Sequence, residues 1–252
     1  MSPGRRLLVA ALALGLAAPG HAQGPPGKRP KVVLGAGAVA APSPYKGVSS
    51  HITPVPFVNL QRERFFLRGV QAGWRLWQGE KSSLAAVAQP QFQGYEPGDS
   101  PALAGMATRR WSVDGGLQFT TRRGDLRLSL EAMHDLLGRH GGLLASADLS
   151  YELGGAGFTV APGAGLEWEG RDFVAYYYGV RPTESRPGRP AYDGRGALNP
   201  YAGMRVRYSF NRRWGLFTYL RHRWLDDAIT DSPIVAGDTV YSGVLAVTYS
   251  FF

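Results

Sequence analysis

Cysteine is absent from the 252 residues, so the chain can form no disulfide and carries no cysteine to anchor a lipoprotein. Long apolar runs are also scarce. The mean hydropathy is −0.17 and 44% of the residues are hydrophobic, which excludes a bundle of transmembrane helices. A transmembrane β-barrel has a mean hydropathy in this range, because its apolar and polar residues alternate along each strand and cancel in the average.

The sequence also lacks a basic cluster interleaved with aromatic residues. Its formal charge is +9, and loss of residues 1–22, with Arg5, Arg6 and no acidic residue, would lower this by two to +7. The remaining basic residues are dispersed, so we expect no nucleic-acid partner. A basic exported barrel would instead face the phosphates of lipopolysaccharide or anionic wall polymers.

The N-terminus has the three parts of a secretory signal peptide. Arg5 and Arg6 are followed by an apolar run over 7–18, and Gly20-His21-Ala22 is a small-x-small cleavage site. About a dozen apolar residues are too few for a spanning helix, which needs about 20. We therefore predict a cleaved signal peptide over residues 1–22 and one outer-membrane β-barrel domain over residues 23–252, with no linker or second domain.

The last fourteen residues, Thr239 to Phe252, alternate with a period of two. One face carries Tyr241, Leu245, Val247, Tyr249 and Phe251, and the other carries Val240, Ser242, Val244, Ala246, Thr248 and Ser250. A bilayer-spanning strand needs about 9–11 residues with aromatic residues at the interfaces. The segment is also similar to the closing strand of bacterial outer-membrane barrels, whose aromatic-x-Phe ending matches Tyr249-Ser250-Phe251, with Phe252 one residue beyond.

Similar alternation recurs along the chain. Segments 111–120, 126–133, 145–152 and 158–168 follow one another, joined in turn by tight turns and longer loops. Such a pattern predicts an all-β, antiparallel transmembrane barrel of about 12 strands. Ten is the alternative if Phe65–Trp77 is one strand and Phe173–Val180, a short strand or loop wall, is loop.

If the apolar faces meet lipid, the polar faces line the barrel interior. The charged residues expected there are Asp114, Arg127, Glu131, Asp148, Glu152, Arg205, Arg207, Arg221 and Arg223. One interpretation is a pore lining that favours anions. The other is an Arg–carboxylate lattice that holds the barrel and blocks conduction, which we favour because the two signs occur in similar numbers.

Catalysis and metal binding have weaker support. His134-Asp135 lies near a predicted strand end, and Ser129 or Ser146 could approach it to form a hydrolase site. Glu167, Glu169 and Asp172 could bind a cation at a loop rim, but their spacing matches no defined metal loop. We therefore predict no enzymatic activity, no catalytic residue, no cofactor and no metal.

Several motifs in one order resemble the MltA-interacting protein/OmpV family of Gram-negative outer-membrane proteins. The early motifs are Pro44-Tyr45-Lys46-Gly47, Pro54-Val55-Pro56 and Phe65-Phe66-Leu67-Arg68-Gly69, and the middle ones are Leu103-Ala104-Gly105-Met106 and Arg109-Arg110. The later motifs are Tyr177-Tyr178-Gly179-Val180, Glu184-Ser185 and Asp231-Ser232-Pro233-Ile234-Val235. Each is weak alone, and the combination covers essentially the whole mature chain.

The resemblance implies an outer-membrane barrel without established catalytic residues. For the family's namesake it implies a scaffold that brings a murein lytic transglycosylase together with a peptidoglycan synthase. The turns 121–124 and 211–213 would then be contact points. The alternatives are a small-solute pore and a surface barrel with a role in adhesion or stress response. The motif residues also have a purely structural interpretation, with Ser232-Pro233 as a turn and the tyrosines as an aromatic girdle.

Overall fold

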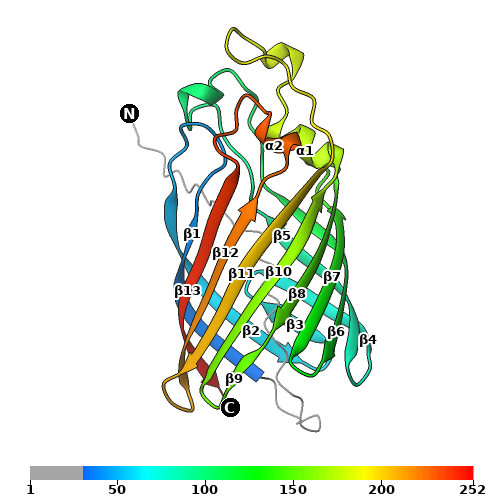
Figure 1. Ribbon diagram of the computed structural model, residues 1–252, viewed down its shortest axis with the longest axis vertical. Coiled ribbons are helices and arrows are strands. Elements are labelled where there is room, and N and C mark those ends of the chain that lie inside the picture. The colour runs from blue at the N-terminus through cyan, green and yellow to red at the C-terminus, as the bar shows by residue number, and fades with distance from the viewer. Residues whose placement is uncertain (1–30, 252) are drawn as a thin grey trace.

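The computed structural model describes residues 31–251, so the predicted signal peptide and Phe252 lie outside the described residues. Thirteen strands form one antiparallel sheet, and pairing of β10 with β11 closes it into a barrel (Figure 1). Because β9 continues β8 along the same edge of β10, the wall counts twelve strands. The predicted barrel and its strand number are thereby confirmed.

The strands are β1 (Lys31–Ala41), β2 (His51–Arg62), β3 (Phe65–Arg68), β4 (Gln71–Gln78), β5 (Ser82–Gln91), β6 (Ser112–Arg123), β7 (Leu126–Asp135), β8 (Leu143–Tyr151), β9 (Leu153–Gly155), β10 (Phe158–Glu169), β11 (Ala197–Ser209), β12 (Trp214–Trp224) and β13 (Thr239–Phe251). The helices are α1 (Arg171–Tyr178) and α2 (Asp227–Thr230), with 3₁₀ turns at Pro101–Leu103 and Pro182–Glu184. No helix within residues 31–251 is long and apolar enough to span a bilayer.

Two rings of exposed aromatic side chains mark the part of the wall that meets the membrane. Three strands carry one near each end, ten residues apart: Phe158 and Trp168 on β10, Trp214 and Trp224 on β12, and Tyr241 and Phe251 on β13. Ten residues of a strand tilted by about 40° rise about 25 Å, which is the height of the apolar band in outer-membrane barrels. Between the rings, Leu166, Leu220 and Leu245 are exposed to lipid.

The two ends of the barrel differ in the length of their connections. Short turns at 63–64, 79–81, 124–125 and 210–213 lie at one end, and loops 42–50, 92–111, 136–142, 170–196 and 225–238 lie at the other, together with α1 and α2 (Figure 1). In such barrels the short turns are periplasmic and the long loops extracellular.

The structure determines the conformation of the two segments for which the sequence left alternatives. Phe65–Trp77 contains two strands, because Gly69, at φ +59°, turns the chain between β3 and β4. Phe173–Val180 is neither strand nor loop wall but lies largely in α1. Phe173, Val174, Tyr177 and Tyr178 recur at helical spacing and are buried on one face. The following strand β11 begins at Ala197.

Candidate functional site

The charged residues predicted to face the interior are all buried or half-buried. Asp114, Arg127 and Arg205 are buried, and Glu131, Asp148, Glu152, Arg207, Arg221 and Arg223 are half-buried. Apolar side chains on the alternate positions, such as Leu130, Leu149 and Leu220, are exposed on the outside of the wall. The period-two pattern therefore separates a lipid face from a charged lumen.

The extracellular half of the lumen contains a ladder of ion pairs between β10 and β12. Arg221 lies 2.5 Å from Glu167, and Arg223 lies 2.9 Å from Glu169 and 3.4 Å from Glu167. Each carboxylate thus has a cation, so the desolvation cost of burial is offset by pairing. We define Glu167, Glu169, Arg221 and Arg223 as the ion-pair ladder.

Glu167 and Glu169 were not among the predicted lumen residues. From the sequence, a cation site that they would form with Asp172 at a loop rim was considered and not favoured, and a solvated acidic rim was expected instead. Both carboxylates turn inward, Trp168 between them turns outward, and Asp172 is exposed on α1. The alternation of β10, in which Leu166 and Trp168 are the apolar positions, contained the signal for this inward orientation.

The periplasmic half of the lumen is richer in arginine. Arg207 lies 2.9 Å and Arg122 3.7 Å from Glu152. Nearer the ladder, Tyr201 donates its hydroxyl to Asp148 over 3.1 Å. Arg205 stacks over Tyr219, with 5.8 Å between guanidinium and ring centroid. Here aromatic rings, as well as carboxylates, hold the guanidinium groups in place.

A second arginine group surrounds Phe66 near the short β3–β4 hairpin. The guanidinium carbons of Arg68 and Arg75 lie 4.1 and 5.3 Å from the centre of the Phe66 ring, which is 1% exposed. Gly73 on β4 leaves room for this ring, because a side chain at that position would overlap it. The Phe66 ring therefore occupies the space that Gly73, which has no side chain, leaves free in the lumen.

A cavity of about 210 Å³ extends from the extracellular loops past the ladder, whose four residues line it. Tyr45 lines it from the loop above, Glu131 and Arg223 line its sides, and Arg205 lies toward the periplasmic half. Gln71 and Gln118 both donate to Glu131, over 2.9 and 2.8 Å. A hydrogen-bonded group of polar side chains is consequently gathered around Glu131 on one side of the cavity.

The extracellular loops pack over the lumen as a cap with its own hydrophobic core. Its buried side chains come from four loops: Tyr45, Tyr95, Leu103, Phe173, Val174, Tyr177, Tyr178, Ala228, Ile229 and Ile234. Helix α1 supplies four of them because its buried face points inward. Burial of this apolar surface orders loops that would otherwise be mobile.

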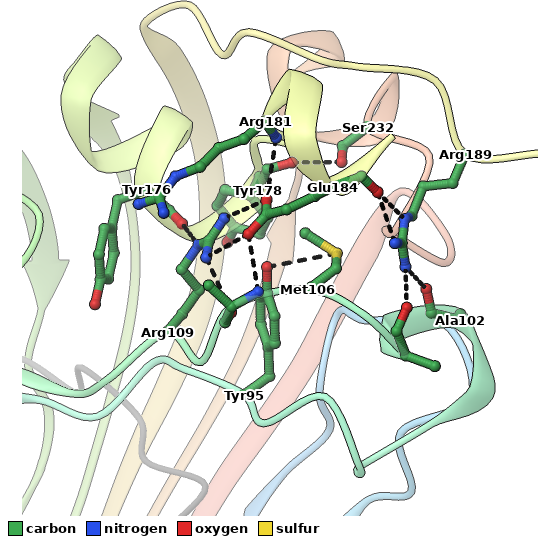
Figure 2. Close-up of polar contacts among 12 residues, drawn as sticks. Tyr95, Ala102, Met106, Arg109, Tyr176, Tyr178, Arg181, Glu184, Arg189 and Ser232 are labelled. Atoms are coloured by element: carbon green, nitrogen blue, oxygen red, sulfur yellow. Dashed lines mark hydrogen bonds and ion pairs between the residues drawn. The ribbon is translucent and has the colours of Figure 1, made fainter. Parts of the chain in front are cut away.

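A buried ion pair joins two of the cap loops (Figure 2). Arg109 Nη2 and Nη1 lie 2.8 and 3.1 Å from the two carboxylate oxygens of Glu184. The same carboxylate accepts backbone N–H groups of Ala107 and Arg181 over 2.8 and 3.0 Å. Burial alone would raise the pKa of Glu184, but the hydrogen bonds from Arg109 and the backbone outweigh it and hold the pKa below its usual value.

Arg189 forms a second link between the two loops that Arg109 and Glu184 join, because it donates hydrogen bonds to backbone carbonyl oxygens. It donates to Ala102 over 2.8 Å, to Ala104 over 3.0 Å and to Glu184 over 2.7 Å, as Figure 2 shows. The guanidinium group thus links the 3₁₀ turn at Pro101–Leu103 to the loop after Pro182–Glu184 through hydrogen bonds.

The two family-motif segments meet inside this cap. Ser232 donates its hydroxyl to the carbonyl of Tyr178 over 2.6 Å (Figure 2). Tyr177, Tyr178, Gly179, Val180 and Ser232 are buried, Pro233 is half-buried and Asp231 is exposed. The tyrosines therefore do not form an aromatic girdle, since they lie in the cap core rather than at the lipid surface.

Asp114 is bound by a residue that the sequence did not suggest. His140 Nδ1 accepts the N–H of Gly142, so Nε2 carries the proton and donates to Asp114 over 2.9 Å. Nearby, Asp135 binds Ser112 and accepts the backbone N–H groups of Leu137, His140 and Gly141. Both histidine nitrogens and both Asp135 oxygens are thus occupied, which leaves a poor set of ligands for a metal ion, even though Asp114, Asp135 and His140 cluster.

The hydrolase residues considered from the sequence do not come together. His134 is exposed, and its ring contacts the carbonyl of Asp135. Ser129 is five residues away on the same strand, about 17 Å at the usual rise, and pairs with Asp148 on β8. Ser146 pairs instead with Glu131 and lines the cavity. No hydrogen-bonded series from serine to histidine to carboxylate follows from these positions.

Comparison with known proteins gives a consistent assignment. The family model described as MltA-interacting protein MipA matches residues 34–251. The MltA-interacting protein of Escherichia coli (strain K12) is 32% identical over 239 residues, covering 92% of this chain and 92% of that protein. Outer membrane protein OmpV of Vibrio cholerae is 27% identical over 173 residues, covering 69% of this chain and 67% of that protein.

Among solved structures, an outer membrane channel from Pseudomonas putida F1 is 15% identical, with a TM-score of 0.49 over 92% of this chain and 99% of that chain. Relatives named as outer membrane proteins and the barrel described above place the chain in the outer membrane, in contact with its lipid. With its family model matched from Leu34 to Phe251, the chain belongs to the MltA-interacting protein MipA family.

Proposed function

We propose that this outer-membrane barrel is a non-enzymatic scaffold that binds a murein lytic transglycosylase and a peptidoglycan synthase. The observation that carries the proposal is the set of ion pairs and packed loops within and above the lumen. The ion-pair ladder spans β10 to β12, and the cap with its buried Arg109–Glu184 pair covers the extracellular mouth. A lumen occupied in this way favours the lattice interpretation over an open pore, and leaves the outer surfaces of the barrel for function.

The periplasmic turns are the surfaces that could reach cell-wall enzymes. Arg123 and Arg212 are exposed in the β6–β7 and β11–β12 turns. Asn211 shapes the second turn, because its side chain accepts the N–H groups of Arg213 and Trp214 over 2.8 and 2.9 Å. Exposed arginines on well-defined turns suit a partner with an acidic surface.

The name of the relative from Escherichia coli states an interaction with MltA, and this supports the transglycosylase as the first partner. The second partner, the peptidoglycan synthase, follows from the family role that the motifs imply. At the opposite end, Arg139, Arg171 and Arg195 are exposed, and we propose that they meet lipopolysaccharide phosphates.

Crosslinking in intact outer membranes, followed by purification of the tagged barrel and mass spectrometry, tests the scaffold. We expect a lytic transglycosylase above the level recovered with an unrelated barrel. The paired change Arg123→Glu and Arg212→Glu should reduce that recovery at least tenfold. Arg139→Glu, at the extracellular end, is the matched control and should not reduce it.

Planar-bilayer recording tests the competing hypothesis, a solute pore. The closed lumen predicts no steady conductance for the wild-type barrel. Steady conductance that falls when Arg205 and Arg207 are changed, with no cell-wall enzyme recovered after crosslinking, would replace the scaffold with a solute pore.

A further inference from the structure

The barrel wall is interrupted above the short β3–β4 hairpin. Its β3 strand pairs with only the last four residues of β2, from Asn59 to Arg62. One more rung follows, in which the N–H of Gly69 donates to the carbonyl of Val58 over 2.7 Å. Within residues 31–251, no strand pairs with the first seven residues of β2 on the side away from β1.

The facing edge belongs to β5. Its last pair with β4 is Ala72 with Ala88, so Gln89–Gln91 continue toward the loops with β6 on one side only. We call the space between residues 51–57 of β2 and residues 89–91 of β5, above Gly69 and Val70, the lateral notch. It occupies the extracellular half of the wall, because β2 enters from the long-loop end.

The backbone edges of the notch carry prolines. The carbonyl of Val58 points toward β3, and alternate residues of a strand point the same way, so Pro54 and Pro56 turn their backbone edges to the notch. The carbonyl of Ser82 points toward β4, which places Pro90 of β5 on the corresponding edge. Proline has no N–H. Each unpaired donor facing lipid would cost several kcal/mol, about 2–7 by transfer measurements, and these three positions expose none.

The outer rim of the notch is apolar. The side chains of Ile52 and Val70 are 76% and 40% exposed, and Pro54 and Pro56 are exposed beside them. These residues share the outward face with the rest of the lipid-facing wall. The material that meets the rim is therefore the hydrocarbon of the bilayer.

The inner side of the notch carries polar side chains and lies beside the cavity. Gln71, at the top of β4, is fully buried and donates to Gln89 over 3.1 Å and to Glu131 over 2.9 Å. Gln89 and Gln91 line the cavity from the β5 side, and Val48 and Ser49, which lead into β2, line it from the other. The cavity thus reaches the β5 edge of the notch and the loop that leads into β2.

We propose that the notch is a lateral portal through which an outer-leaflet lipid inserts its polar head group into the cavity. The acyl chains stay at the apolar rim of Ile52, Pro54, Pro56 and Val70. The glutamine side chains and the ladder bind the head group through hydrogen bonds and charge. A cavity of about 210 Å³ is smaller than the pockets of about 300–1,000 Å³ that enclose whole small molecules, so it suits a head group whose chains remain in the membrane.

Site-specific photo-crosslinking tests the portal directly. A benzoylphenylalanine replaces Gln91 at the notch, and the barrel is placed in vesicles of phosphatidylethanolamine and phosphatidylglycerol, with or without lipopolysaccharide. Ser146, which also lines the cavity but lies on β8 between two paired neighbours, is the matched inward control. Leu149 on the same strand is exposed to lipid and is the positive control.

After irradiation, we expect lipid adducts at positions 91 and 149 and at least tenfold fewer at 146. The adduct mass identifies the lipid, and either a phospholipid or lipopolysaccharide supports the portal. Adducts at 149 without adducts at 91 would overturn it, as would equal labelling at 91 and 146. Gln89→benzoylphenylalanine provides a second notch position if the first variant fails to fold, which the heat-induced gel shift of the barrel would reveal.

Discussion

Arg109 and Glu184 lie 75 residues apart in the chain and form a two-pronged ion pair at the centre of the extracellular cap. Their side chains are 1% and 6% exposed. The pair joins the loop between β5 and β6 to the loop between α1 and β11, which no backbone pairing connects. The order of the cap therefore depends on a contact whose loss would leave a charge buried without a partner.

Glu184→Gln should loosen the cap and leave the barrel intact. Removing one partner of a buried pair costs about 3–5 kcal/mol, and local opening should rise by about 100-fold or more. Trypsin cleavage after Arg110, which directly follows Arg109 and precedes Trp111 in the chain, measures this opening in the folded protein. Asp193→Asn, which breaks the exposed pair with Arg171, is the control and should change the rate less than about fivefold. Equal rates for the two variants would contradict the role of the buried pair.

The same carboxylate predicts how the cap responds to acid. Because the pKa of Glu184 is held below its usual value by Arg109 and backbone N–H groups, its stabilisation is fully present above the ordinary glutamate pKa of about 4.3. It is lost as the pH falls through the lowered pKa of the folded state. Hydrogen exchange of loop 92–111 should stay slow at pH 5, after correction for the intrinsic exchange rate, and accelerate only below about pH 4. Glu184→Gln should remove this acid-dependent acceleration of exchange. If the pH dependence is the same in the variant, the acceleration arises from another titrating group.

Arg223→Ala should open the ion-pair ladder. Arg223 is the residue that contacts both Glu167 and Glu169, so its loss leaves Glu169 without its cation and removes bulk from the lumen. We expect brief conductance events in planar bilayers that the wild type lacks, with a preference for cations. Arg212→Ala, on an exposed turn, should remain silent. Silence of both variants would show that the cap alone is sufficient to close the barrel.

Leu245→Arg tests the position of the membrane. Leu245 is 53% exposed and lies near the middle of β13, between the aromatic residues Tyr241 and Phe251. An arginine at the bilayer midplane costs about 2–4 kcal/mol, and one near the interface about 0–1 kcal/mol. Equilibrium unfolding in urea should therefore separate Leu245→Arg from Tyr241→Arg on the same strand. Equal destabilisation by the two changes would show that Leu245 does not lie at the bilayer midplane.

Much of the barrel could be read from the sequence because its determinants are local. Alternation around Leu126, Leu128 and Leu130 places one face toward lipid whatever the neighbouring strand is, and the predicted segment lies within β7. The α1 segment was misassigned for a related reason. Its run of Tyr176, Tyr177 and Tyr178 suits a strand by propensity, whereas packing of a helical face into the cap determines the actual conformation.

The sequence by itself determined the outer-membrane barrel class, the closing strand and the lipid face, because period two and aromatic spacing act within single strands. Only the tertiary structure decided that Glu167 and Glu169 pair with Arg221 and Arg223, that Arg109 meets Glu184, and that the short hairpin leaves a notch edged by prolines. These features join residues far apart in the chain. They depend on strand register and loop closure, which no local pattern specifies.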